Sequence, residues 1–220
     1  MHTRRLTGVF AAGAVIAGLL APSMATAADS RSDRSASLGN RSLAAALTAH
    51  GNGTFDRNWN DYDIVTQAVL AVLKAKPTSA VSVLTQGSVK LTAFVPDDRS
   101  FRRLAKDLTG TAPRTERATF NTLVSAVGVD TIEQVLLYHV VPGARITAKK
   151  ALRSDGAVLT TAQGATIKVG VADRRVPMIV LQDQDPDAFD PIVDPMALDL
   201  NKGNKQIAHG IVFVLRPADL

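Results

Sequence analysis

The segment "LLYHVVPG", residues 136–143, places a tyrosine and a histidine inside an otherwise aliphatic run. An imidazole in such a position could act as a general base, as a metal ligand or as a buried hydrogen bonder. A general base needs a nucleophile and an orienting carboxylate, and the chain has no G-x-S-x-G turn to present a serine. His50, His139 and His209 also lack the spacing of metal ligands. We therefore interpret His139 as structural and predict no catalytic residue and no metal site.

A second candidate is the acidic stretch "DQDPDAFDPIVD", Asp183 to Asp194. Asp183, Asp185 and Asp187 occupy the first three ligand positions of an EF-hand loop. The match then ends, because Ala188 stands where the turn needs glycine, and Asp194 stands where a bidentate glutamate belongs. Two interpretations stay open, a cation site and a plain solvated loop, and the prolines of the stretch favour the loop.

Composition limits the class of protein. Of 220 residues, 46% are hydrophobic and 20% are charged, with a formal net charge of +5, which is typical of a globular domain. The basic residues are scattered with few aromatics among them, so nucleic-acid binding is not expected. Cysteine is absent, which excludes disulfides, cysteine-ligated metals and a lipoprotein anchor. No glycine-rich phosphate loop occurs, and no cofactor is predicted.

The first residues have the pattern of an export signal. Arg4 and Arg5 precede a short apolar stretch that ends in Ala25-Thr26-Ala27, as in a secretory signal peptide. The stretch is shorter than the roughly 20 residues of a membrane span. We expect a signal peptide at 1–27, a polar linker at 28–60 and a folded domain at 61–220. This organisation predicts a secreted, extracellular protein with no membrane span after cleavage.

Helical periodicity dominates the first half of the chain and strand patterns the second, which predicts an α+β domain. Asp63 is the expected N-cap of one helix, Asp97 or Asp98 of another, and Gly128 is the expected end of a third. Helices are predicted over 43–49, 62–76, 97–108, 116–127 and from 130 to the Tyr-His pair. Strands are predicted over 91–95, 157–161, 165–169, 176–181 and 211–215.

Three stretches, in this order, resemble the signatures of the fasciclin (FAS1) domain family. "LTAFVPDDRSF", residues 91–101, is similar to the first signature, "LLYHVVPG" to the Tyr-His signature, and "IAHGIVFVLRPADL", residues 207–220, to the closing one. The resemblance covers about 62–220. The motif positions that carry over are Phe94, Pro96, Asp97, Asp98, Tyr138, His139 and Gly210.

The chain departs from the family pattern at several of these sites. Asp97 replaces the usual threonine, His209 the asparagine before Gly210, Phe213 a histidine of the closing strand, and Arg216 the usual aspartate. These changes keep the apolar pattern of the fold, and they bear on partner specificity.

The resemblance implies a β-wedge of two sheets with packed helices. It implies a non-enzymatic module for cell adhesion or surface and matrix recognition, whose partner is an extracellular protein or a cell-surface glycan. In animal members the Tyr-His region is linked to receptor binding, which makes Tyr138 and His139 binding candidates. We also expect a monomer, in which His139 bonds the turn around Asp97 or Asp98. The alternative function is a carrier that holds a small apolar ligand in a cleft of the wedge, which a solvent-connected apolar pocket of about 300 Å³ or more would favour.

Overall fold

A computed structural model describes residues 37–173 and 178–218 of the chain. They belong to one compact unit, Ser37–Leu220. The expected signal peptide at 1–27 and the start of the expected linker lie outside the described residues. The remainder of that linker, 37–60, is packed, because Leu43 and Leu47 are buried in the core of the unit. The folded unit therefore begins before residue 61.

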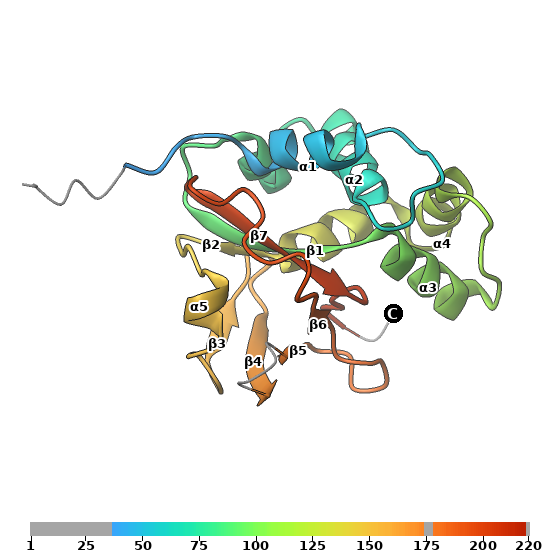
Figure 1. The fold of residues 1–220 in the computed structure, drawn as a ribbon. Coiled ribbons are helices and arrows are strands. Elements are labelled where there is room, and N and C mark those ends of the chain that lie inside the picture. The colour runs from blue at the N-terminus through green and yellow to red at the C-terminus, as the bar shows by residue number, and fades with distance from the viewer. Residues whose placement is uncertain (1–36, 174–177, 219–220) are drawn as a thin grey trace, which may run out of the picture. The chain divides into compact units, whose positions relative to one another are not determined.

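The helices occupy the first half of the unit and most strands the second (Figure 1), which confirms the predicted α+β class. The helical elements are α1 (Leu43–Gly51), α2 (Asp63–Ala75), the 3-10 helix η1 (Ala80–Thr85), α3 (Asp98–Thr109), α4 (Glu116–Tyr138) and α5 (Ala148–Ala151). The strands are β1 (Leu91–Pro96), β2 (Val140–Pro142), β3 (Val158–Thr160), β4 (Thr166–Asp173), β5 (Met178–Gln182), β6 (Ile192–Val193) and β7 (Gln206–Val212).

The strands form a seven-stranded sheet in the order β2-β1-β7-β6-β5-β4-β3. β1 and β7 are parallel, and every other neighbouring pair is antiparallel. The two sheets expected from the family are thus joined into one hydrogen-bonded series, because β7 pairs with β1 on one side and with β6 on the other.

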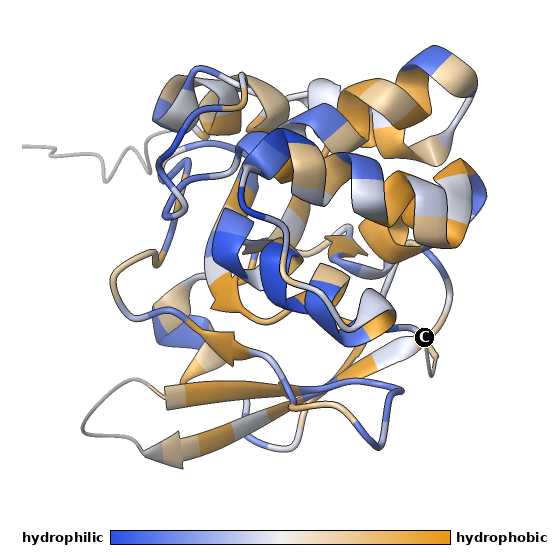
Figure 2. Cartoon of the chain, turned by 90° about the vertical axis from the view of Figure 1, so that its right-hand side faces the viewer, coloured by the Kyte–Doolittle hydropathy of each residue, from blue (hydrophilic) through white to orange (hydrophobic). Residues whose placement is uncertain are grey.

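Two hydrophobic clusters lie on either side of β1. Leu91, Ala93 and Val95 belong to the cluster shared with helices α1 to α4, whereas Phe94 belongs to the cluster of β4, β5 and β7. Alternate residues of a strand point to opposite faces, so a strand buried on both faces reads as a continuous apolar run. In Figure 2 the strands are mostly hydrophobic, whereas the helices carry both hydrophobic and hydrophilic stretches.

Two local predictions can be compared directly with the backbone. Gly128 has φ 77° inside α4 and separates its two helical segments, as expected of a glycine in a left-handed conformation. The closing strand is shifted from the predicted 211–215 to Gln206–Val212. It begins at the fully buried Gln206, whose side-chain amide donates to the carbonyls of Val83 and Gln86. A search for aliphatic runs misses the start of such a strand, because its first residue is polar.

Candidate functional site

His139 is buried at the C-terminal end of α4, with both ring nitrogens hydrogen-bonded. Nδ1 lies 2.7 Å from the carbonyl oxygen of Val135, and Nε2 lies 3.0 Å from the backbone N–H of Leu215. A carbonyl can only accept and an N–H can only donate, which assigns the proton to Nδ1. Burial lowers the pKa of His139 to about 4. The imidazole is therefore neutral and fully engaged at physiological pH.

Tyr138 is fully buried and points to a different part of the sheet. Its hydroxyl donates to the carbonyl oxygen of Thr166 in β4 at 2.8 Å, and burial, ahead of the charge of Asp183, raises its pKa to about 12. The Tyr-His pair thus fastens the end of α4 to two separate segments. A partner contact made by these two side chains, as the family resemblance implies, stays a prediction, because it would require this region to open.

The prediction that His139 bonds the turn at Asp97 and Asp98 was wrong, because its ring nitrogens bond Val135 and Leu215 instead. The carboxylate of Asp97 caps α3 by accepting from the backbone N–H and the hydroxyl of Ser100, at 2.8 and 2.6 Å. The link between the two motifs is instead a backbone one, since the Phe94 N–H donates to the His139 carbonyl at 3.0 Å. Short polar side chains at a helix start satisfy that helix first, which leaves Asp97 unavailable to the imidazole.

Two further motif positions have packing roles. Pro96 ends β1 opposite Ile211 of β7. A Cβ atom on Gly210 would lie 2.5 Å from Cβ of Ala197 and 2.7 Å from the hydroxyl of Tyr62. Glycine is therefore required at position 210 by space.

Two carboxylates of the acidic loop between Asp183 and Asp194 are fully occupied by hydrogen bonds and an ion pair. Asp183 accepts from the N–H groups of Asp185 and Arg216, and Asp185 accepts from those of Asp187 and Ala188. The second oxygen of Asp185 pairs with the guanidinium of Arg216 at 3.2 Å. These contacts leave Asp183 and Asp185 no carboxylate oxygen without a partner, and they favour the plain-loop interpretation.

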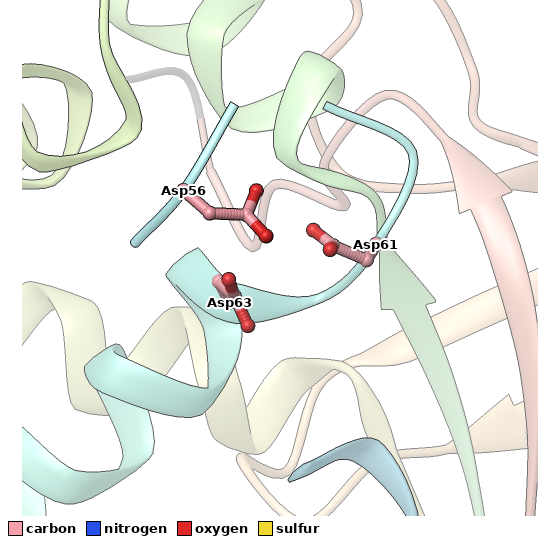
Figure 3. A group of neighbouring side chains, drawn as sticks. All are labelled: Asp56, Asp61 and Asp63. Carbon is pink, nitrogen blue, oxygen red and sulfur yellow. The ribbon is translucent and has the colours of Figure 1, made fainter. Parts of the chain in front are cut away.

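A different group of carboxylates converges around the N-terminus of α2. Asp56, Asp61 and Asp63 point toward one another (Figure 3), and one oxygen from each lies within 4.8 Å of the others. Asp61 belongs to a second set of the same dimensions with Asp98 and Glu116. We call these five residues, Asp56, Asp61, Asp63, Asp98 and Glu116, the carboxylate cluster.

Backbone hydrogen bonds explain the placement of the cluster. Asp98 accepts from the N–H groups of Asp63 and Ile64, at 3.3 and 2.9 Å, and so caps α2 from the start of α3. The prediction that Asp63 is the N-cap was wrong, since Tyr62 holds that position without a side-chain bond. Glu116, at the start of α4, accepts from the Asp56 N–H at 2.6 Å. The starts of three helices therefore meet here, and helix starts favour negative charge.

The cluster has a strong electrostatic signature. Burial raises the pKa of Asp63 to about 6, with the charges of Asp61 and Asp56 adding to the shift. Burial also raises the pKa of Asp98 well above its usual range, and the facing Asp61 stabilises its protonated form. Burial raises the pKa values of Asp61 and Glu116 as well. Desolvation and mutual repulsion both oppose charging of this group.

Sequence reasoning missed the cluster. The segment "DRNWNDYD", residues 56–63, reads as turn chemistry, because aspartate and asparagine are common in turns. The available signal was the spacing of Asp56, Asp61 and Asp63 within one loop. Asp98 and Glu116 come from distant segments, and only the tertiary structure brings them to that loop.

A groove lies between α3, the acidic loop and the segment after β7, with a cavity volume of about 440 Å³. Phe189 is 79% exposed, and its ring stacks on that of Phe213 with 5.7 Å between centroids. The guanidinium of Arg103 lies 5.1 Å from the Phe213 ring. Phe213 has φ 74°, a strained conformation for a bulky side chain, and the Ser100 hydroxyl accepts its N–H at 2.9 Å.

A smaller apolar cavity of about 70 Å³ lies within the core shared by the helices and β1. Its lining is almost wholly aliphatic and aromatic and includes Leu47, Phe101 and Leu136. Pockets for drug-sized ligands usually hold about 300–1,000 Å³. This cavity is therefore well below the size expected of a carrier.

Comparison with known proteins adds a family assignment to this geometry. No curated protein gives a significant match. Among solved structures, the FAS1 domain pair from the insect cell adhesion molecule fasciclin I is similar, with 16% identity and a TM-score of 0.48; the match covers 69% of this chain and 46% of that one. The model of the fasciclin domain matches residues 65–187, more than half of the chain. The chain therefore belongs to the fasciclin domain family.

Proposed function

We propose that this chain is a secreted, non-enzymatic and monomeric module for cell adhesion or surface and matrix recognition, with an extracellular protein or a cell-surface glycan as its partner. Membership of the fasciclin domain family supports this, since such domains are often involved in adhesion and are typically extracellular. The signal-like pattern at 1–27 is consistent with export. No helix in the part of the chain that the structure describes is long and apolar enough to cross a membrane.

The groove beside α3 is the surface that supports recognition best, and the exposed Phe189 stacked on Phe213 is the observation that carries the proposal. Aromatic residues and arginine are enriched where proteins bind partners. An exposed ring held rigidly by a second ring offers contact area at a low entropic cost. Arg103 and Asp107, which also line the groove, would supply charged hydrogen-bonding groups to either kind of partner.

The non-enzymatic part of the proposal is supported by the two buried histidines. His139 has both nitrogens bonded to backbone groups. His209 is held in the same way, with Nε2 2.8 Å from the Ile146 carbonyl and Nδ1 accepting from the Asp199 N–H at 3.3 Å. An imidazole whose two nitrogens serve the fold has none left to exchange a proton with a substrate.

The carrier alternative has less support. It requires a solvent-connected apolar pocket of about 300 Å³ or more, whereas the apolar cavity between the helices and β1 measures about 70 Å³. The larger groove is lined by charged as well as apolar residues, which suits surface contacts better than enclosure of a small apolar ligand.

The proposal is tested by measuring binding of the purified protein to a glycan array, to wall polysaccharide and to intact cells of its source. Phe189→Ala should weaken binding at least tenfold. Met196→Ala is the matched control, because Met196 is 91% exposed but does not line the groove. Equal binding by the wild type and Phe189→Ala would contradict the assignment of the groove. Absence of binding to every surface would contradict the function itself.

A further inference from the structure

The carboxylate cluster contains buried oxygens without hydrogen-bond partners. Asp63 is 1% exposed, and neither of its carboxylate oxygens has a partner. One oxygen of Asp61 and one oxygen of Glu116 are also buried without a hydrogen-bond partner. The backbone N–H of Gly53 lies on the side of Asp63 and lowers its pKa, but it makes no hydrogen bond to either oxygen. Buried polar groups are nearly always satisfied by protein, by water or by an ion.

No basic side chain neutralises this charge within the described residues. The ion pairs found there involve Lys76 with Asp130 and Glu133, and Arg216 with Asp107 and Asp185. Buried charges are normally paired or coordinate metals. The carboxylate cluster has the negative charge of such a site and lacks a protein counter-charge.

The spacing of the oxygens suits a hard cation. Oxygens from Asp56, Asp61 and Asp63 lie within 4.8 Å of one another, a separation that oxygens sharing one calcium ion at about 2.3–2.6 Å can have. Their side chains converge on a common space (Figure 3). Calcium accepts irregular sets of oxygen ligands, whereas magnesium demands a near-octahedral arrangement.

The arrangement of the two buried carboxylates depends on Gly51, at the end of α1. A Cβ atom on Gly51 would lie 2.7 Å from Oδ1 of Asp63 and 3.0 Å from Oδ2 of Asp61. Any larger residue at position 51 would press on these two carboxylates. Glycine at position 51 therefore lets the end of α1 pack closely against Asp61 and Asp63 without displacing their carboxylates.

We propose that the carboxylate cluster binds one calcium ion through the carboxylates of Asp56, Asp61 and Asp63. Asp98 and Glu116 are positioning residues, because they accept backbone N–H groups of Asp63 and Asp56 and so hold the ligand loop in place. This proposal stands independently of the proposed recognition function.

The loop carries its own spectroscopic probe. Trp59 is the only tryptophan of the chain and lies between Asp56 and Asp61. Terbium substitutes for calcium at oxygen sites, and its luminescence is sensitised by a tryptophan close to it. Excitation of Trp59 should therefore give terbium luminescence that added calcium reverses. Calcium itself should bind with one equivalent per chain, with a dissociation constant on the order of 10⁻⁴–10⁻³ M, the range of low-affinity calcium sites.

The experiment titrates the full chain, first stripped with EDTA, with calcium chloride alone and follows terbium luminescence, binding heat and thermal unfolding. At 10 mM calcium the unfolding midpoint should rise by about 5 °C. Asp63→Asn should abolish this rise and should be at least as stable as the wild type in EDTA, because repulsion is relieved. Asp56→Asn, at an exposed position, should fold normally and weaken calcium binding at least tenfold.

Asp187→Asn is the matched control, because Asp187 is an exposed carboxylate of the acidic loop, and it should leave every signal unchanged. The proposal is overturned if calcium produces neither a midpoint shift nor a loss of terbium luminescence. It is also overturned if the calcium response persists in both Asp63→Asn and Asp56→Asn, or disappears in Asp187→Asn. An equal or larger shift with magnesium would overturn the assignment to calcium.

Discussion

The backbone N–H of Leu215 donates a hydrogen bond to Nε2 of His139 at 3.0 Å, joining the end of α4 to a segment 76 residues further along the chain. The same imidazole donates from Nδ1 to Val135. A neutral histidine thus acts as a two-sided connector between a helix and the chain that follows the last described strand. The Tyr-His signature of this chain is buried architecture.

Replacement of His139 by alanine should therefore lower the free energy of unfolding by about 2–3 kcal/mol, because the Leu215 N–H loses its partner and a cavity remains. Tyr138→Phe should cost only about 0.5–1 kcal/mol, since the Thr166 carbonyl keeps a second donor in Gln184 at 2.9 Å. Urea titration measures both. An unchanged midpoint for His139→Ala would contradict the connector role.

Stability should depend on pH through His139. Its pKa in the folded protein is about 4, below the value of about 6.5 in an unfolded chain. Between these values the unfolded state binds more protons, so the contribution of His139 is complete above about pH 6.5 and is lost as the pH falls toward 4. The loss amounts to at most about 3 kcal/mol.

The measurement compares wild type and His139→Gln by urea titration at several pH values between 4 and 7. The difference in unfolding free energy between the two proteins reports on the imidazole alone. The cluster carboxylates, whose pKa values are raised and whose effect on stability therefore has the opposite pH dependence, are present in both proteins and cancel. The difference in unfolding free energy between the wild type and His139→Gln should become smaller as the pH falls from 7 to 4. A gap of constant size would show that His139 does not change its charge on unfolding.

Arg216 holds the acidic loop against α3. Its side chain is 13% exposed, and its guanidinium contacts the surface residue Asp107 and Asp185, whose side chain is 1% exposed. Arg216→Met should cost about 2–3 kcal/mol, because the carboxylate of Asp185 is left buried without its cation. Asp107→Asn should cost less than about 1 kcal/mol, as for exposed pairs. Thermal unfolding measures both variants, and an equal loss of stability in Arg216→Met and Asp107→Asn would contradict this ranking.

Gly210 is required by close packing. Its Cβ position is occupied by Ala197 and Tyr62, at 2.5 and 2.7 Å, so Gly210→Ala should destabilise by about 1–3 kcal/mol through overpacking. Gly170→Ala in β4 is the control, because its nearest contact would be an ordinary 3.8 Å from Val180. If the two variants unfold at the same urea concentration, crowding at position 210 is not the reason for glycine there.

The sequence predicted those features that depend on neighbours along the chain. The α+β class, the cap at Asp97 and the left-handed Gly128 follow from periodicity and local backbone chemistry. The start of β7 could not be predicted in this way, because Gln206 is buried through a side-chain hydrogen bond to η1 that no local sequence pattern encodes. The cap of α2 was missed for the same reason, since Asp98 reaches it from another helix.

The acidic regions illustrate the limit of motif matching. Asp183 and Asp185 resemble a cation loop in sequence, yet backbone N–H groups and Arg216 satisfy their carboxylates. Asp61 and Asp63 resemble an ordinary turn, yet they are buried beside two more carboxylates. Whether an oxygen is available to an ion depends on which groups the tertiary fold brings to it.

The position of β7 between β1 and β6 has a consequence for the nascent chain. β7 contributes Ala208 to the core shared with the helices and Ile211 to the core of the strands. A growing polypeptide that has not yet emerged beyond residue 212 therefore leaves both cores open and β1 without its parallel neighbour. Pairings this distant in sequence raise contact order and slow folding. Neither hydrophobic core of the described unit can therefore be completed before β7 has been synthesised.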